Sequence, residues 1–550
     1  MAALKKEQFA ILSESRVLIA LPIHTKLYLK GKVQVESIVK NAIEIFGANF
    51  NAKSEFPIDV YSPKGYSLLY FEAIEDSKHS TDLKNYDDKK DQKILKRFSI
   101  QYQDCSLFIL KKMTDQPWTD YVEDLLKYSD SKKHKMALFG KEKWVKDDPQ
   151  VPEPIEDILD ISLFVAEEFE DFKARLLNKN PQWDYALQSV QIAQESGRHP
   201  KIIGTGGKGV GKSTTLKYIS NKLLEHGQAV LWIDLDPGQA EFTLPGMLSA
   251  TLLNKPILGP NFTHLDRQVV FSVYLGSVNV SDVLHRYRKG REELSWFLQD
   301  SKYSDVPWII NTMGFNRGLG LTLLKETMQL FQPTTLIEIK SRHPKKNYEV
   351  NMTEMLQSDS NYLEFQAMPE DTDKEMNTND LWGIPEPYKL RDIVILAHLA
   401  KSGLLSKIPY SVSFQDLKVQ IVHYNVPPRQ VELVLNTALV SFGYTNDTNN
   451  IVDKNVVVPS QGFGIIRAVD PKRQLFYVLT DLDPEQLQNI NCVTAGSIFL
   501  PNGVFTSKIK NKLDKSTPYV QEKPALETPL NIPWQRSGKP RLPEFQSKNK

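Results

Sequence analysis

The stretch Gly-Gly-Lys-Gly-Val-Gly-Lys-Ser-Thr-Thr at residues 206–215 decides the fold of this 550-residue chain. It fits the pattern G-x-x-x-x-G-K-S/T, whose fixed positions are occupied by Gly206, Gly211, Lys212 and Ser213. Glycines let successive backbone N–H groups turn inward around an anion, and the N-terminus of the next helix points at the same anion. Lys212 is then placed to reach the β- and γ-phosphates, and the Ser213 hydroxyl is placed to hold Mg²⁺. The stretch therefore predicts a phosphate loop for a nucleotide and its metal.

The sequence around this loop alternates between strand and helix patterns. An apolar run at 200–203 leads into the loop, and leucine and isoleucine recur at helical spacing after it, until Gly227. A helix is also predicted over 319–330, and further strands are predicted at 229–233, 269–275, 306–310 and 335–339. This alternation predicts an α/β domain with a parallel, doubly wound sheet and chemistry at the carboxyl ends of its strands.

The two ends of the chain differ from its middle in their pattern of apolar and polar residues. Residues 1–75 and the region after about 405 carry short apolar runs separated by turn residues, which is typical of antiparallel β-sheet, whereas 155–176 has a helical pattern. The tail 508–550 holds ten Lys/Arg, four Asp/Glu and six prolines, so we expect that it does not fold alone. The expected domains are an N-terminal β-rich domain (1–175), a P-loop kinase domain (176–405), a C-terminal β-rich domain (406–507) and the basic, Pro-rich tail (508–550).

Bulk composition narrows the possible function classes. The net charge is +1, so any nucleic-acid binding must come from local basic patches. The two cysteines, Cys105 and Cys492, argue against a disulfide framework or a cysteine-rich metal site and fit a reducing compartment. We find no apolar run of about 18 residues and no apolar N-terminal segment, so we expect neither a membrane span nor a signal peptide.

Two carboxylates follow the strand at 229–233. In a parallel sheet, Asp234 and Asp236 would lie beside the γ-phosphate and Mg²⁺. One could hold the water shell of the metal, while the other takes a proton from an acceptor hydroxyl that attacks in line. The spacing leaves open which aspartate has which role, and whether the pair only serves the metal of an ATPase. Gln239 is either an amide that orients water or phosphate, or a turn residue.

Other candidate groups face the same crevice. Asn311 ends the strand at 306–310, and Phe315 shortly after it either stacks on a base or belongs to the core. Basic clusters at 285–291 and 340–346 suit contacts to a phosphate backbone, or are solvated faces. Arg391 opens an apolar helix, where it is either a lid arginine that reaches the transferred phosphate or an exposed first-turn residue.

Taken together, the motifs resemble those of the polynucleotide 5′-hydroxyl kinases, and specifically the nucleolar branch that processes pre-rRNA. The matching pieces stand at 206–214, 234–239, 258–264 and 311–320, and the segment 462–467 also looks like this family. The resemblance implies ATP-dependent phosphorylation of RNA with a 5′-hydroxyl end, with ATP and Mg²⁺ bound. It also implies a location in the nucleus and nucleolus, and a HEPN-type endoribonuclease as the partner that cuts the second internal transcribed spacer (ITS2). In the family a C-terminal segment engages that nuclease, which would give the tail from Lys508 a role.

The resemblance also assigns residues to the site. Phe315 stands where the family usually carries the Trp that clasps the first base, Ser277 stands in for a usual Thr, and Arg391 matches the lid arginine by position. The expected catalytic residues are Lys212, Asp234, Asp236 and Arg391, and the expected metal ligands are Ser213 and Asp234. The expected nucleotide contacts are Gly206, Gly207, Lys208, Gly209, Val210, Gly211, Lys212, Ser213 and Thr214, and the expected RNA contacts are Gln239, Ser277, Asn311 and Phe315.

Two alternative functions remain. In a partitioning-type or cluster-assembly-type ATPase, an extra lysine precedes the loop lysine by five residues, but here Gly207 is at that position and Lys208 comes one place late. Those ATPases are also typically compact single domains. The other alternative is a scaffold that binds nucleotide for stability and recruits a nuclease; the intact Lys212, Asp234 and Asp236 count against a dead site. RNA or DNA preference and the adenine contacts stay open.

Overall fold

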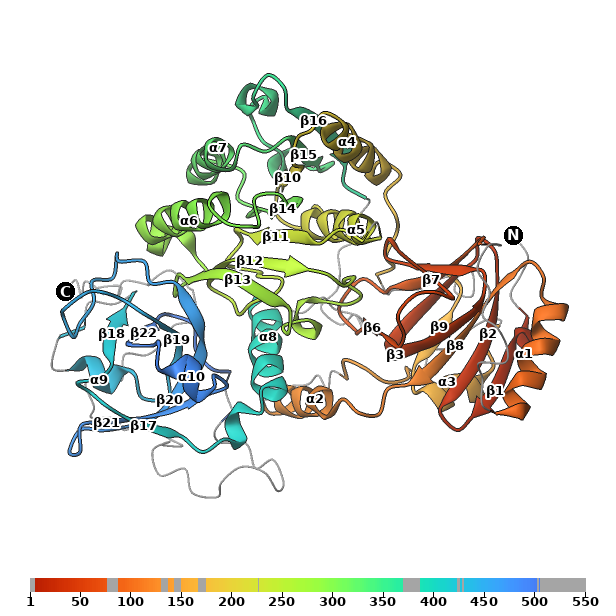
Figure 1. Cartoon of the computed structure of the whole chain (residues 1–550), viewed down its shortest axis with the longest axis horizontal. Helices are drawn as coiled ribbons and strands as arrows, with labels where there is room; N and C mark the ends of the chain where they lie inside the picture. Colours follow the sequence, from red (N-terminus) through yellow and green to blue (C-terminus); the bar gives the residue numbers. More distant parts are fainter. Residues whose placement is uncertain are drawn as a thin grey trace, which may run out of the picture.

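The computed structural model describes residues 5–76, 88–129, 137–142, 150–166, 175–225, 227–368, 386–422, 426–427, 430–501 and 504. Within these residues, three β-sheets follow one another along the molecule, and helices pack on the middle one (Figure 1). The N-terminal sheet is red to orange, the central sheet runs through yellow and green, and the C-terminal sheet is blue. The basic tail predicted at 508–550 lies outside the described residues.

The N-terminal sheet is built around one long strand. Strand β3 (Lys26–Lys40) pairs with four others, and every pairing in this sheet is antiparallel, as the short alternating runs predicted. The sheet order is β1 (Phe9–Ser13), β2 (Arg16–Pro22), β8 (Cys105–Lys112), β3, β7 (Tyr70–Ile74), β4 (Ala42–Ile45) and β5 (Ala48–Asn51). Off this path, β6 (Ile58–Ser62) and β9 (Ser162–Phe164) also pair with β3.

Three helices accompany the N-terminal sheet: α1 (Lys89–Gln101), α2 (Pro117–Ser129) and α3 (Glu153–Leu159). The helix predicted over 155–176 is wrong beyond its first turns. Helix α3 ends at Leu159 because Asp160 adopts a left-handed conformation (φ 54°), and the chain then enters strand β9. Residues 167–174 of the predicted helix lie outside the described residues.

The central sheet is mixed rather than wholly parallel. Its order is β13 (Gln268–Tyr274), β12 (Met247–Leu253), β11 (Val230–Asp234), β14 (Trp308–Asn311), β10 (Lys201–Gly206), β15 (Thr335–Lys340) and β16 (Asn361–Gln366). The five strands from β11 to β16 in this order are parallel, whereas β12 and β13 run antiparallel. The prediction of a parallel sheet is wrong for β12 and β13. No crossover helix separates β11, β12 and β13, so the chain returns along the sheet in the opposite direction.

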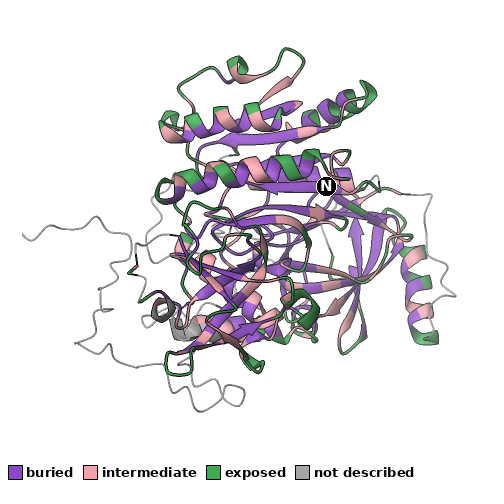
Figure 2. Cartoon of the chain, turned by 60° about the vertical axis from the view of Figure 1, so that its left-hand side comes forward, coloured by how far each residue is buried: buried purple, intermediate pink, exposed green. Residues whose placement is uncertain are grey.

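Helices cover both faces of the central sheet, which makes it doubly wound as predicted. Helices α4 (Trp183–Glu195) and α5 (Lys212–Leu224) pack on the face to which Ile202 points. Helices α6 (Leu284–Gln299) and α7 (Leu319–Phe331) pack on the opposite face, to which Ile203 points. Figure 2 shows the result: the strands between the helices are buried, and the outer helix faces are exposed.

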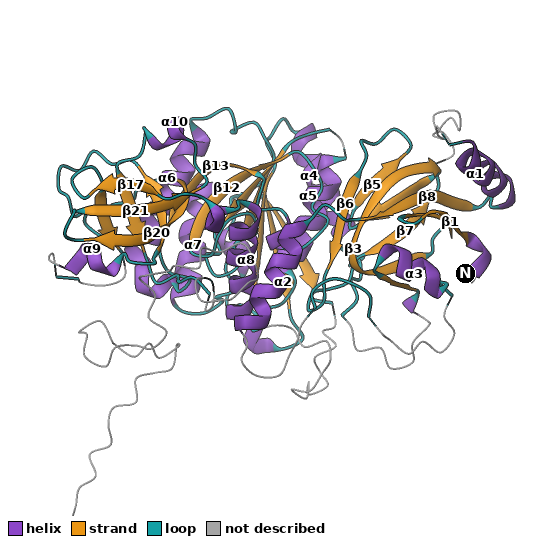
Figure 3. Cartoon of the chain, turned by 90° about the horizontal axis from the view of Figure 1, so that it is seen from below, coloured by secondary structure: helices purple, strands orange, loops and turns teal. Residues whose placement is uncertain are grey.

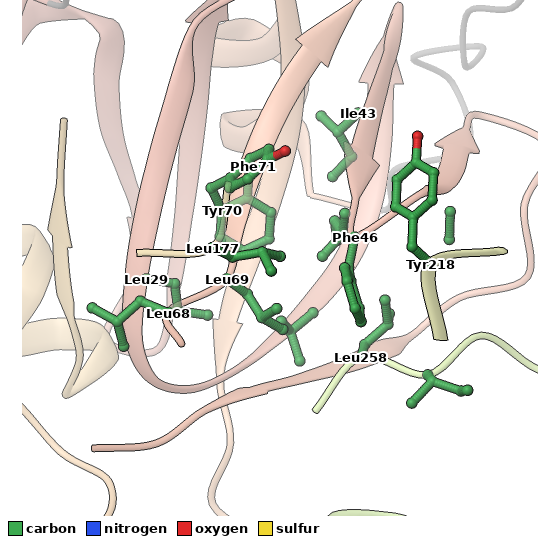
Figure 4. Packing of buried hydrophobic residues seen from close by; sticks show 14 of the residues in the cluster. Leu29, Ile43, Phe46, Leu68, Leu69, Tyr70, Phe71, Leu177, Tyr218 and Leu258 are labelled. Atoms are coloured by element: carbon green, nitrogen blue, oxygen red, sulfur yellow. The ribbon is translucent and has the colours of Figure 1, made fainter. Parts of the chain in front are cut away.

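The N-terminal sheet is fixed on helix α5, which follows the phosphate loop. The ring of Phe46 lies 6.4 Å from that of Tyr218, and Leu258 packs beside them (Figure 4). Asn221 Nδ2 donates to the backbone oxygen of Phe46 at 2.8 Å, and Lys222 Nζ lies 3.1 Å from a carboxylate oxygen of Glu44. Apolar packing, a hydrogen bond and an ion pair thus join the two parts of the chain.

The C-terminal sheet has the order β17 (Tyr410–Ser413), β21 (Leu475–Thr480), β20 (Ser460–Asp470), β19 (Leu439–Gly443), β22 (Cys492–Ala495) and β18 (Lys418–Ile421). All its pairings are antiparallel except that of β18 with β22. Two short helices, α9 (Val431–Val434) and α10 (Pro484–Leu487), belong to this region. The buried cysteines lie in separate sheets, Cys105 in β8 and Cys492 in β22.

Helix α8 (Pro387–Lys401) lies between the three sheets. It runs beside α2 of the N-terminal region (Figure 3), and one apolar cluster joins Ile393 and Leu396 of α8 to Trp118 of α2, Phe262 and Ile465 of β20. Among the helices that the structure describes, we find none whose length and apolar content would allow it to cross a bilayer.

Candidate active site

The phosphate loop connects β10 to α5 with the geometry that the sequence predicted. Gly209 and Gly211 have positive φ angles of 76° and 97°. Gly206 has φ 138°, and a Cβ atom there would lie 2.5 Å from the carbonyl oxygen of Ile339. A Cβ atom on Gly207 would lie 2.3 Å from the carbonyl oxygen of Lys346. The start of the loop therefore admits only glycine, because other backbone packs directly against it.

Lys212 lies over this loop. Its Nζ donates a hydrogen bond to the Gly207 carbonyl at 2.8 Å, and the side chain is 8 % exposed. Burial lowers the pKa of Lys212 to about 8, although the charge of Asp236 acts in the opposite direction. The ammonium is thus held where a nucleotide phosphate would be bound. The protein alone stabilises its charged form only weakly, because burial outweighs the attraction of Asp236.

Strand register places two polar residues, Asn311 and Asp234, at one level of the sheet edge. Asn311 of β14 lies opposite Gly204 of β10 and opposite Asp234 of β11. The Ser213 hydroxyl donates to Asn311 Oδ1 at 3.2 Å, and Asn311 Nδ2 donates to Asp234 Oδ1 at 3.1 Å. The two predicted metal ligands, Ser213 and Asp234, are therefore connected through the buried Asn311 amide.

Asp234 and Asp236 lie in different surroundings. Asp234 is 1 % exposed and accepts hydrogen bonds from the Glu241 N–H at 2.8 Å and the Asp236 N–H at 3.2 Å. Burial raises the pKa of Asp234 to about 7. Asp236 is partly exposed and accepts from the Gly238 N–H at 2.9 Å. Burial also raises the pKa of Asp236, and the Lys212 ammonium opposes this rise.

A cavity of about 140 Å³ opens beside the loop. Its wall includes Tyr66, Ser213, Lys217, Gln239, Asn261 and Arg391. The Gln239 side chain is exposed, and Arg391 is half-buried at the start of α8. Among the described residues, the Arg391 guanidinium has no hydrogen-bond partner. Burial lowers the pKa of Arg391, while the charges of Asp392 and Asp236 raise it. Ser213, Gln239 and Arg391, which are far apart in sequence, thus meet at one cavity.

Phe315 lies at the mouth of the loop and is 45 % exposed. A Cβ atom on Gly314 would lie 2.7 Å from Lys208 Cα, so the chain before Phe315 runs directly along the loop. Asn316 Nδ2 donates to the backbone oxygens of Lys345 at 3.1 Å and Asn347 at 2.7 Å. Phe315 is therefore not a core aromatic: the residue is exposed, its ring lies against Gly320, and its neighbours Gly314 and Asn316 contact the phosphate loop and the basic segment 340–346.

Two other predicted groups are engaged inside the protein. Ser277 is 2 % exposed, and its hydroxyl accepts from the Asn279 N–H at 3.1 Å within a turn. Arg286 and Arg291 of the basic cluster 285–291 are each 2 % exposed. Arg286 donates to the Tyr274 carbonyl at 2.9 Å, and Arg291 donates to the Leu323 carbonyl at 2.8 Å. These two arginines stabilise the fold rather than present charge to a ligand.

Sequence reasoning missed the polar residues on the far wall of the cavity. Glu241 Oε1 accepts from Lys217 Nζ at 3.1 Å and from His264 Nε2 at 3.0 Å. Burial acts to raise the pKa of Glu241, but the Lys217 ammonium and the His264 hydrogen bond outweigh it and lower the pKa to about 2. His264 belongs to the motif at 258–264, which offered a signal. Tyr66 and Lys217 belong to no motif, and only the fold brings them to the cavity.

Three family models match consecutive parts of the chain. "Polynucleotide 5'-hydroxyl-kinase NOL9, N-terminal domain" matches residues 6–159, "mRNA cleavage and polyadenylation factor CLP1 P-loop" matches 206–378, and "NOL9-like, C-terminal domain" matches 405–501. The chain is similar to proteins named polynucleotide 5′-hydroxyl-kinase NOL9. The similarity to the Homo sapiens protein is 28 % identity over 372 residues, covering 58 % of this chain and 52 % of that protein. For the Dictyostelium discoideum protein it is 24 % over 596 residues, covering 94 % and 84 %.

The chain spans about half the length of the first curated relatives it matches, which come from Homo sapiens, Danio rerio and Drosophila melanogaster. Among solved structures, the chain resembles Clp1p in a complex of wild-type Clp1p with Pcf11p. The TM-score is 0.51 at 13 % identity, covering 89 % of this chain and 99 % of the other. This likeness shows a shared fold.

Proposed function

Because the chain is similar to proteins named polynucleotide 5′-hydroxyl-kinase NOL9, we propose that it belongs to that family and transfers the γ-phosphate of ATP to the 5′-hydroxyl end of RNA. The observation that carries this proposal is the register of β10, β14 and β11. It brings the loop, Asn311 and the aspartate pair to one edge, beside a cavity that also holds Arg391. Donor binding, metal binding and proton transfer would then take place at adjoining positions.

The residues present fit a magnesium ion. Ser213 and Asp234 offer hydroxyl and carboxylate oxygens, and Mg²⁺ is usually bound by one or two carboxylates together with substrate phosphates. No group of three or more His, Cys, Asp or Glu side chains suited to a metal occurs in the part of the chain that the structure describes. A bound Mg²⁺ would neutralise charge on the transferred phosphate.

The environments of the two aspartates suggest separate roles. Asp234 is fully buried, and backbone N–H groups and the Asn311 amide hold its carboxylate on the metal side. Asp236 is partly exposed and close enough to Lys212 for their charges to interact. We assign Asp236 as the base that takes the proton from the 5′-hydroxyl, and Lys212 and Arg391 as cations for the charge that develops on the transferred phosphate.

On the acceptor side, Phe315 offers an exposed ring on which the first base of the RNA would stack. Gln239 is exposed at the cavity and available to orient a phosphate or a water. Asn311 would position Ser213 and Asp234 rather than contact the RNA, since it is 1 % exposed and joins these two residues. Ser277 would shape the turn at 276–279 rather than contact RNA, because its hydroxyl is buried.

One assay separates the kinase from the two alternatives. The protein is incubated with γ-labelled ATP and a 5′-hydroxyl RNA oligonucleotide, and the label on the RNA is followed. We expect labelled RNA with the wild-type protein and none with Lys212→Ala. ATP hydrolysis without labelled RNA would support an ATPase, and tight ATP binding with neither reaction would support a scaffold.

We further propose that the protein acts in pre-rRNA (ITS2) processing in the nucleolus, together with a HEPN-type endoribonuclease. The match of NOL9-named family models to residues 6–159 and 405–501 supports this. The division into an N-terminal domain (1–175), a kinase domain (176–405) and a C-terminal domain (406–507) stays a prediction. The test is to purify the tagged full chain from its own cells under gentle conditions. A co-purifying HEPN-type nuclease and nucleolar fluorescence of the tagged chain are expected, and their joint absence would contradict this role.

A further inference from the structure

The cavity beside the phosphate loop is lined by residues from distant parts of the chain. Helix α5 contributes Ser213 and Lys217, helix α8 contributes Arg391, and the N-terminal region contributes Tyr66. At about 140 Å³ the cavity has room for several waters or for a phosphate group, since roughly 10–15 Å³ suffice for one water. The N-terminal region therefore reaches the proposed site of phosphoryl transfer directly.

Tyr66 lines this cavity and carries a hydroxyl that is not hydrogen-bonded within the described part of the chain. Its oxygen is buried and has no hydrogen-bond partner among the described residues. The ring is held by packing against Phe262, with ring centroids 5.8 Å apart. Burial and the charge of Glu241 raise the pKa of Tyr66, so the phenol keeps its proton and is a hydrogen-bond donor. A buried polar group without a partner is costly, which suggests that a ligand supplies the missing acceptor.

The charge of the cavity wall favours an anion. Arg391 lines the cavity with no hydrogen-bond partner among the described residues, and Lys217 Nζ lines it 3.1 Å from Glu241. Glu241 is the acidic residue of this wall, and its Oε1 already accepts from both Lys217 and His264. The donors of Tyr66, Lys217 and Arg391 thus converge on one space in which the acidic side chain is already paired.

We propose that Tyr66 and Lys217 complete, with Arg391, a phosphate subsite in which the N-terminal region contacts the ligand of the kinase site. This rests on the proposed function, because the bound phosphate would be either the γ-phosphate of the nucleotide or an internucleotide phosphate of the acceptor. Tyr66 is then a binding residue supplied by a region whose sequence carries no phosphate-binding motif.

The experiment uses the full chain and Tyr66→Phe, which removes one oxygen and keeps the ring on Phe262. Dissociation constants are measured for MgADP and for a magnesium-bound, non-hydrolysable ATP analogue, and the KM is measured for a 5′-hydroxyl RNA. A γ-phosphate at the subsite predicts about tenfold weaker binding of the analogue with MgADP unchanged. An acceptor phosphate predicts an RNA KM raised about tenfold with both nucleotides unchanged.

The control is Tyr274→Phe, which removes another buried hydroxyl without a partner, at a position on β13 away from this cavity. We expect wild-type constants and an unchanged Tm for this variant. Unchanged constants in Tyr66→Phe would overturn the proposal, and so would an equal loss for MgADP and the analogue or a Tm below that of Tyr274→Phe. If the wild-type protein transferred no phosphate, the proposed function would fail, while the two nucleotide measurements would still test the subsite.

Discussion

At the scale of single residues, Asp234 and Asp236 show how two identical side chains acquire different chemistry. Only one residue separates them, yet Asp234 is fully enclosed by hydrogen-bond donors, whereas Asp236 is partly exposed and faces Lys212. The difference arises because β11 ends at Asp234, whereas Asp236 lies in the loop that follows the strand. The position of each aspartate relative to the strand end therefore underlies the proposed roles, Asp234 as the metal-side carboxylate and Asp236 as the base.

Replacing either aspartate tests this separation. We expect Asp234→Asn and Asp236→Asn each to lower phosphate transfer by at least ~10²-fold, because metal positioning or the base is lost. Only Asp234→Asn should raise the Mg²⁺ concentration needed for half-maximal transfer. The measurement is a Mg²⁺ titration of initial rates. Near-wild-type transfer in both variants, or the same Mg²⁺ dependence in both, would contradict the assignment.

Lys212 gives a prediction for pH. Its pKa of about 8 means that the side chain loses its proton as pH rises through 8 in the nucleotide-free protein. Phosphate favours the charged form, so ATP binding above pH 8 should take up protons, and ATP affinity should fall as pH rises further. Calorimetry at pH 8.5 in buffers of different ionisation enthalpy measures this uptake. We expect none in Lys212→Met, and equal heats in all buffers for the wild-type protein would refute the prediction.

Phe315 gives a prediction for acceptor binding. Phe315→Ala should raise the KM for RNA and leave ATP affinity unchanged, because a stacked base is worth roughly 1–3 kcal/mol. Phe315→Trp serves as the matched control, since a larger ring in the same exposed place should keep or lower the KM. An RNA KM unchanged in Phe315→Ala would show that the ring does not hold the base.

At the scale of elements, helix α8 has a buried apolar face and an N-terminal turn that lines the cavity. Leu396 and Ile393 lie in the cluster that joins α2, Phe262 and β20, while Arg391 in the first turn lines the cavity. The apolar face fixes the axis of the helix, and the axis fixes where the guanidinium lies. The two halves of this element should therefore respond differently to substitution.

We expect Arg391→Gln to lower transfer by about 10²-fold with little change in Tm, because the guanidinium faces the cavity rather than a protein partner. Leu396→Ala, at 1 % exposure, should cost about 2–5 kcal/mol of stability. Rates and thermal denaturation curves of the two variants check both statements. A large loss of Tm in Arg391→Gln would indicate a structural role instead.

At the scale of the whole molecule, the N-terminal sheet is fixed to the helix that follows the phosphate loop. Asn221 of α5 is central to this attachment: its Nδ2 donates to the Phe46 and Ile257 carbonyls, and its Oδ1 accepts from the Ile257 N–H at 2.7 Å. The side chain is fully buried. One amide thus satisfies three backbone groups, and one of them, the Phe46 carbonyl, lies across the boundary in the N-terminal region.

Asn221→Ala should loosen this attachment. Each buried backbone group left without a partner costs about 1–3 kcal/mol, so we expect the single unfolding transition to split into two. Calorimetric scans at several rates would show this. The control outside the boundary is Asn316→Ala, which removes the hydrogen bonds of a half-buried amide to the Lys345 and Asn347 carbonyls. One unshifted transition in Asn221→Ala would show that the attachment does not depend on this amide.

Sequence reasoning was most successful where the signal is local. The loop, the strand leading to Asp234, and helices α5 and α7 on opposite faces follow from spacing and apolar periodicity, because buried parallel strands read as continuous apolar runs. Strands β12 and β16 were missed, and the helix over 155–176 was cut short by the left-handed Asp160. The exposure of Phe315, the burial of Ser277 and the arrival of Tyr66 at the cavity depend on contacts between distant segments, which no local pattern encodes.

The positions of the two cysteines allow local opening of the two outer sheets to be measured by thiol labelling. Cys105 and Cys492 are buried one to each outer sheet, and burial raises the pKa of both thiols, that of Cys492 to about 11. Only the thiolate attacks an electrophilic thiol reagent, so modification must wait until the strand around each cysteine opens. Because the described part of the central sheet carries no cysteine, the labelling rates of Cys105 in β8 and Cys492 in β22 would report the local opening of the N-terminal and C-terminal sheets separately.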